Sequence, residues 1–308
     1  MRKREKDKNP GRGALLALFC GATGIAFAPV FVRLSSVGPS ATAFWRITLA
    51  LPLLGLWMAI DRKRIPLSER PPLTPDFWGF FLAGVFFAGD LAVWHWSIRL
   101  TTVANATLLA NFAPVFVTLF AWLLFRERVT SGFLAGMVIA LLGTTLLLGS
   151  SFQLSRQYVF GDGLGLLTAV FYAGYILSVN RLRRRHCVPV IMTLGGIFCS
   201  LTLLVITLLS GEGLLPPSGR AWLVLLGLAL VSQTAGQGLI AYALAYLPAS
   251  FASVGLLLQP VLATVFAWMI LREGIGLLQG VGGAVILVGI ILAKRGSVLL
   301  NAERNLVR

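Results

Sequence analysis

Residues 114–127 read PVFVTLFAWLLFRE, and residues 260–273 read PVLATVFAWMILRE, with no gap between the two copies. The second copy follows the first by nearly half of the 308-residue chain. A repeat at this distance predicts one hydrophobic unit that is used twice. Many membrane transporters are built from two such halves, so transport is the first function class to consider.

The composition indicates a polytopic membrane protein. Hydrophobic residues make up 57% of the chain and charged residues 12%, which is far less charge than a soluble domain carries. The formal net charge is +15, but the basic residues form short clusters between apolar runs of about 20 residues, the length that a bilayer requires. We therefore expect no nucleic-acid partner. The three cysteines match no metal-ligand spacing, and their odd number argues against a disulfide framework.

Hydropathy and turn signals predict ten transmembrane helices. Their approximate ranges are 14–34, 39–60, 77–99, 103–125, 130–149, 161–181, 188–210, 220–243, 248–270 and 275–293. These helices divide the chain into a basic arm (1–12), a first five-helix repeat (13–150), a second repeat (161–293) and a tail (294–308). The arm and the first apolar run also have the form of a signal peptide, but the apolar run continues past its small-residue site, so we expect a retained first helix.

The distribution of basic residues predicts the orientation. With the N-terminus in the cytoplasm, 20 Lys and Arg residues lie on the cytoplasmic side and five on the other side, so both termini, the arm and the tail are expected in the cytoplasm. Five helices per half is an odd number, so the second repeat has inverted topology. This arrangement predicts a substrate site near the midplane and alternating access. A duplication kept for structural reasons alone is the alternative.

Several short motifs accompany the repeat. They are Ala104-Asn105-Ala106, Pro114 and Arg126-Glu127 in the first half, and Gly161-Asp162-Gly163, Ser250-Phe251-Ala252-Ser253, Pro260 and Arg272-Glu273 in the second. Together they resemble the ten-helix EamA-type branch of the drug/metabolite transporter superfamily. The chain is similar to its bacterial inner-membrane exporters of amino acids, including aromatic ones. The resemblance implies a cavity lined mainly by helices 1, 3, 4, 6, 8 and 9, with helices 5 and 10 at the periphery. The first helix lacks the acidic residue of the small four-helix multidrug members.

Two charged residues lie inside the predicted spans. A charge at a helix centre costs about 2.5 to 3.5 kcal/mol, so each needs an explanation. Arg46 and Asp90 lie at depths that agree to within about one helical turn. In a functional interpretation, Arg46 binds a substrate carboxylate or Asp90 carries a coupling proton. The alternatives are a structural ion pair and snorkelling of Arg46. His95 suits proton transfer but lies about 140° from Asp90 around the helix, so a structural histidine is its alternative.

Polar and aromatic side chains inside the spans should face the interior of the bundle, because lipid offers them no partner. The predicted substrate-binding residues are Arg46, Asp90, Trp94, His95, Asn111, Tyr172, Tyr175, Gln233, Gln237 and Gln259. Their aromatic rings would stack on a partly apolar substrate or bind its ammonium group. Hydrogen bonding between helices, worth about 0.6 kcal/mol per residue, is the alternative. Pro114 and Pro260 are predicted as symmetric hinges, with static kinks as the alternative.

The sequence therefore predicts a secondary transporter of the bacterial inner membrane that exports small amphiphilic metabolites, with amino acids, aromatic ones included, as leading substrates. Export of drugs or other metabolites is the alternative within the same fold. We expect a monomer in the lipid bilayer with a small-molecule substrate and neither cofactor nor metal; coupling to protons stays open. An enzyme is disfavoured because the chain has no HExxH or GxSxG motif, and a receptor because no loop forms a signalling segment.

Overall fold

The computed structural model of the chain describes residues 10–66, 68, 70–101, 103–149, 158–271 and 276–306. Within these residues, all regular secondary structure is helical. Ten helical segments have the length and apolar composition needed to cross a membrane. The all-α architecture of ten spans that the sequence predicted is confirmed. The second Arg-Glu motif, residues 272–273, lies outside the described residues.

Several spans consist of more than one helix. The first five spans are α1 (Pro10–Ala26) with α2 (Ala28–Leu34), α3 (Pro39–Thr48) with α4 (Leu51–Lys63), α5 (Phe77–Leu100) preceded by the turn η2 (Thr74–Asp76), α6 (Val103–Ala110) with α7 (Ala113–Phe125), and α8 (Ser131–Gly149). The next five are α9 (Val159–Leu182), α10 (Val188–Leu209), α11 (Gly219–Gly227) with η4 (Leu228–Gln237) and α12 (Gly238–Ala243), α13 (Ala249–Gly255) with α14 (Leu258–Leu271), and α15 (Leu277–Leu306).

A proline accompanies the break in four of these spans. Pro29, Pro52, Pro114 and Pro260 each lie in the first turn of the second helix of the span. Proline has no amide hydrogen and its ring clashes with the carbonyl four residues earlier, so the preceding helix ends there. Continuous helices kinked at Pro114 and Pro260 were expected, whereas the structure has short turns ahead of both prolines. Motion about these breaks stays a prediction.

The eighth span contains a π-helix, η4, between two α-helical segments. Each of its hydrogen bonds spans five residues instead of the four of an α-helix, and such segments occur frequently at functional sites. The helix α1 packs closely against η4 through glycines. A Cβ added to Gly21 would lie 2.8 Å from the backbone oxygen of Gly236, which shows how near the two backbones approach.

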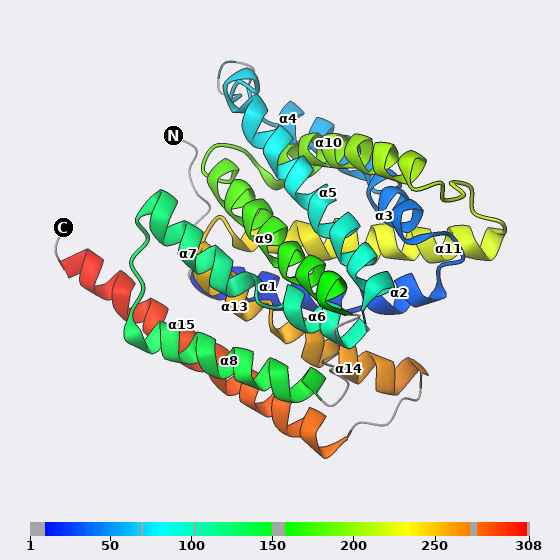
Figure 1. The fold of residues 1–308 in the computed structure, drawn as a ribbon. Coiled ribbons are helices and arrows are strands. Elements are labelled where there is room, and N and C mark those ends of the chain that lie inside the picture. The colour runs from blue at the N-terminus through cyan, green and yellow to red at the C-terminus, as the bar shows by residue number, and fades with distance from the viewer. Residues whose placement is uncertain are drawn as a thin grey trace.

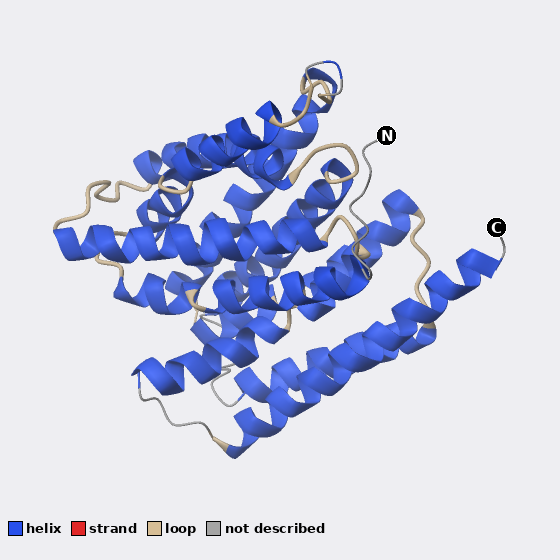
Figure 2. Cartoon of the chain, turned by 180° about the vertical axis from the view of Figure 1, so that it is seen from behind, coloured by secondary structure: helices blue, strands red, loops and turns tan. Residues whose placement is uncertain are grey.

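The fifth and tenth spans form a pair at one edge of the molecule. Helices α8 and α15 run side by side there, away from α3, α4 and α10 at the opposite edge (Figures 1 and 2). The other spans pack in the body between these edges, where α5 from the first half lies along α9 from the second. With α8 and α15 at the edge, the helices of the other eight spans form the body of the molecule, in which the two halves meet.

Candidate substrate cavity

A cavity of about 170 Å³ lies between the two halves of the chain. Its walls come from spans 1, 3, 4, 6, 8 and 9, as the resemblance implied, and also from span 2 through Arg46. Seven of the ten predicted substrate-binding residues line it: Arg46, Asp90, Trp94, Asn111, Tyr172, Gln237 and Gln259. The structure therefore brings together side chains that are up to about two hundred residues apart in the chain.

Interruptions of three spans open onto this cavity. Ala26 and Ala28 flank the break between α1 and α2, Asn111 lies in the turn between α6 and α7, and Pro260 follows the turn between α13 and α14. A helix break inside a membrane is tolerated where it lines a cavity rather than facing lipid. Discontinuous helices also form the substrate sites of many transporters. The breaks give these cavity walls backbone groups as well as side chains.

Arg46 projects from α3 and is buried, with 7% of its surface exposed. Its Nε donates a hydrogen bond of 3.1 Å to Oε1 of Gln233 in the π-helix. Its guanidinium carbon lies 5.8 Å from the centre of the Phe87 ring, within range of a cation–π interaction. Gln233 does not line the cavity, so its position indicates that it orients Arg46 rather than contacting a ligand.

Asp90 reaches the same cavity from α5, one helical turn before Trp94. Among the described residues, no ion pair joins Asp90 to Arg46. A charge in a water-poor site is costly unless it is paired and hydrogen-bonded. The cavity thus holds one cation and one anion that do not neutralise each other by direct contact.

The aromatic side chains form two layers at the cavity. Trp94 and Tyr172 line it directly. Behind them, Tyr175 stacks on Phe87 with ring centres 4.4 Å apart, and it does not line the cavity. His95 is 3% exposed and packs beside Trp94, with ring centres 5.1 Å apart, also outside the lining. The helical period had placed His95 on another face from Asp90, in agreement with this position.

Amide side chains provide the neutral polar groups. In the turn between α6 and α7, the Nδ2 of Asn111 donates to the carbonyl of Thr107 at 2.8 Å, which leaves its Oδ1 as an acceptor. Oε1 of Gln237 is buried and has no hydrogen-bond partner within the described part of the chain. Buried polar atoms are usually satisfied, so an unpaired acceptor at a cavity wall is a candidate contact for a ligand donor.

Polar contacts join the two halves beyond the cavity. Asp162, at the start of α9, accepts hydrogen bonds from Oγ1 of Thr101 at 2.6 Å and from Nδ2 of Asn105 at 3.0 Å. At another point, Oγ of Ser250 donates to Oε1 of Glu127 at 2.7 Å. Sequence reasoning connected several of these residues with the family motifs without assigning them partners, because spacing along the chain does not predict which helix ends meet.

The comparisons with known proteins are consistent with this architecture. The EamA-like transporter family matches residues 12–149 and again residues 159–295. The chain belongs to the EamA-like transporter family. One match falls in each predicted half, and together the two cover most of the chain. This EamA-like protein is a multi-pass membrane transporter, and the cavity between its halves is its candidate substrate site.

Several curated relatives are transporters by name. The chain is 27% identical over 292 residues to the pseudopaline exporter CntI of Pseudomonas aeruginosa, covering 92% of this chain and 96% of the relative. It is 27% identical over 277 residues to a probable terminal-alkyne amino-acid exporter of Streptantibioticus cattleyicolor, covering 88% and 89%. A protein of known crystal structure superimposes with a TM-score of 0.77 at 21% identity, covering 94% of this chain and 99% of that one, which supports the fold.

Proposed function

We propose that this EamA-like protein exports amino acids and related zwitterionic metabolites across the bacterial inner membrane by alternating access. The observation that carries the proposal is the presence of Arg46 and Asp90 in one cavity without an ion pair between them. A substrate with a carboxylate and an ammonium group would supply the missing partner of each. Neither a purely cationic nor a purely anionic substrate would satisfy both charges.

The other cavity walls suit the rest of such a substrate. Trp94 and Tyr172 offer ring faces for a side chain, and Oε1 of Gln237 offers an acceptor for an N–H group. The cavity volume of about 170 Å³ is below the roughly 300–1,000 Å³ typical of drug-sized ligand sites. This size favours a metabolite no larger than a single amino acid in the conformation described. Two of the relatives, named as exporters of pseudopaline and of a terminal-alkyne amino acid, support the direction of transport and the substrate class.

Transport assays in proteoliposomes would test the proposal. Exchange of labelled phenylalanine should be inhibited by free amino acids and only weakly by phenylalanine methyl ester, which lacks the carboxylate. Arg46→Gln should raise the concentration of free amino acid needed for half inhibition by at least about tenfold, because a hydrogen bond to a charged group contributes about 1.5 to 3 kcal/mol. The variant should then no longer distinguish free amino acids from the methyl ester. Arg220→Gln, at the exposed start of α11, is the matched control.

Two outcomes would contradict the substrate assignment. One is the absence of transport across a broad panel of amino acids, with transport of drugs or other metabolites instead. The other is unchanged discrimination in Arg46→Gln. The same vesicles, with and without a pH gradient, would test coupling. Asp90→Asn should abolish any proton-driven flux if Asp90 carries the proton, and unchanged coupling would assign that role to another group.

A further inference from the structure

A second hollow, separate from the substrate cavity, lies where the α4–α5 and α9–α10 connections meet. Its volume is about 240 Å³. Five of its lining residues are arginines: Arg62, Arg70, Arg183, Arg184 and Arg185. None of the described lining residues is acidic. We call these five residues and the space between them the arginine hollow.

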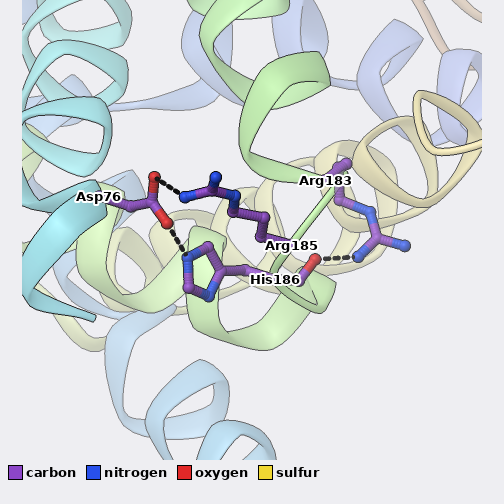
Figure 3. A network of polar contacts seen from close by, with 4 residues as sticks. All are labelled: Asp76, Arg183, Arg185 and His186. Atoms are coloured by element: carbon purple, nitrogen blue, oxygen red, sulfur yellow. Dashed lines mark hydrogen bonds and ion pairs between the residues drawn. The ribbon is translucent and has the colours of Figure 1, made fainter. Parts of the chain in front are cut away.

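The α9–α10 connection is held in place by Asp76, the last residue of η2 and the one immediately before α5. Oδ2 of Asp76 lies 2.8 Å from Nε2 of His186, whose side chain is 1% exposed, and Oδ1 lies 3.7 Å from Nη1 of Arg185 (Figure 3). Nη1 of Arg183 donates to the carbonyl of His186 in the same network (Figure 3). The connection that supplies three arginines is therefore held against the start of the third span without any ligand.

Two of the arginines are anchored through backbone carbonyls. Nε of Arg70 donates to the carbonyl of Ile65 at 2.9 Å, and Nε of Arg183 donates to the carbonyl of Ala241 at 3.1 Å. Burial lowers the pKa of Arg183 below its usual value, because the charged form loses contact with water. Neutral carbonyls satisfy hydrogen-bond donors but do not balance a positive charge. An anion in the hollow would do so.

Two described acidic residues interact with the arginines of the hollow. Asp76 contacts Arg185, and Asp61 interacts electrostatically with Arg183. Within the described part of the chain, these two carboxylates face five guanidinium groups, an excess of three positive charges. Planar guanidinium groups bind the oxygens of a phosphate in pairs, so phosphate is the anion chemistry that such a cluster recognises best.

We propose that the arginine hollow binds the phosphate of an anionic phospholipid headgroup. The hollow lies at the ends of the second and sixth spans and at the start of the seventh, where headgroups are located. Leu53, Leu56, Trp57 and Ile60 form an exposed apolar stripe on the opposite side of α4 from Arg62, which is consistent with a lipid-facing helix beside the hollow. Basic pockets between transmembrane helices bind lipid headgroups in this way. A free phosphate would use the same arginines, and competition by inorganic phosphate separates the two sources.

Native mass spectrometry of the full-length protein released from nanodiscs would test this site. Discs containing equal amounts of phosphatidylglycerol and phosphatidylcholine present both lipids in both leaflets, so the orientation of the protein does not matter. We expect phosphatidylglycerol to be retained in preference. The double variant Arg62→Gln and Arg70→Gln should reduce this preference at least fivefold. The control, Lys63→Gln and Arg64→Gln, removes the same charge from exposed positions of the same segment and should change it less than twofold.

Equal losses in the two double variants would overturn the proposal, since they would indicate general attraction to the charged surface. Absence of any preference for phosphatidylglycerol in the unmodified protein would overturn it as well. A third arm titrates inorganic phosphate into protein in a neutral detergent. Competition by inorganic phosphate at concentrations comparable to the lipid would assign the hollow to a free anion instead. Folding of each variant is checked by its thermal unfolding temperature. None of these outcomes depends on which substrate the cavity transports.

Discussion

At the scale of single residues, Cys187 has an environment that alters its reactivity. Burial and a hydrogen bond with Asp61 raise the pKa of its thiol to about 11. Only the thiolate is nucleophilic, so the alkylation rate of Cys187 should keep rising roughly tenfold per pH unit between pH 8 and pH 10. Iodoacetamide labelling followed by peptide mass spectrometry measures this rate. A plateau near pH 9 would contradict the expected pKa, and Asp61→Asn should shift the curve to lower pH.

The charged residues illustrate what can be predicted at this scale. Arg46 and Asp90 were identified from the sequence because lipid offers an ionised side chain no partner, and the structure places both at one cavity. The roles of Gln233 and Tyr175 as supports behind the lining could not be predicted. The helical period predicts which residues share a face, whereas the depth of each side chain depends on how closely the neighbouring helix approaches.

At the scale of elements, the breaks ahead of Pro114 and Pro260 make a specific prediction. Replacing either proline with alanine restores an amide donor, which favours a continuous helix and moves the adjoining cavity wall. We expect each substitution to reduce the exchange rate by about tenfold, equivalent to 1.4 kcal/mol. Pro52→Ala is the control, because Pro52 follows a similar break, but neither Leu49 nor Ala50 in that break lines the cavity, whereas Asn111 and Pro260 do. Comparable losses in all three variants would indicate a general packing effect rather than hinges.

The pair formed by α8 and α15 makes a prediction about stability. A Cβ added to Gly282 would lie 2.5 Å from the backbone nitrogen of Leu147, whereas one added to Gly280 on the same helix would meet nothing within 4 Å. Gly282→Val should therefore destabilise the protein by about 1 to 3 kcal/mol through overpacking, and Gly280→Val should have little effect. Thermal unfolding in detergent would compare them. A similar shift in both variants would exclude backbone contact as the cause.

At the scale of the whole molecule, the predicted orientation can be measured. Single cysteines replacing Arg64 and Gly213 occupy exposed positions in connections expected on opposite sides of the membrane. The other cysteines are first replaced by serine. A membrane-impermeant maleimide applied to intact spheroplasts should label position 213 and leave position 64 unlabelled until the cells are opened. The reverse pattern would place both termini outside the cytoplasm and would contradict the predicted orientation.

The number of spans was predictable because membrane thickness constrains helix length, and basic residues between the apolar runs marked the connections. The interruptions within spans were harder to predict from the sequence, since hydropathy averages over a whole span and does not resolve a turn of two residues. Four of the breaks are followed by a proline, which explains them once the structure is known. The eighth span changes to a π-helix without any proline between Gly219 and Ala243, and no local signal in the sequence predicted it.

That π-helix has a consequence for how substrate preference could diverge among related proteins. A π-helical segment is commonly equivalent to one residue inserted into an α-helix. Deleting one residue within η4 would regularise it and keep the flanking α-helical segments in register, while changing the direction of the side chains within η4 itself. Another side chain would then replace Gln233 beside Arg46. In homologues whose eighth span is one residue shorter, a side chain other than Gln233 would therefore contact the equivalent of Arg46. A change in the length of this span would then alter several side-chain positions at once.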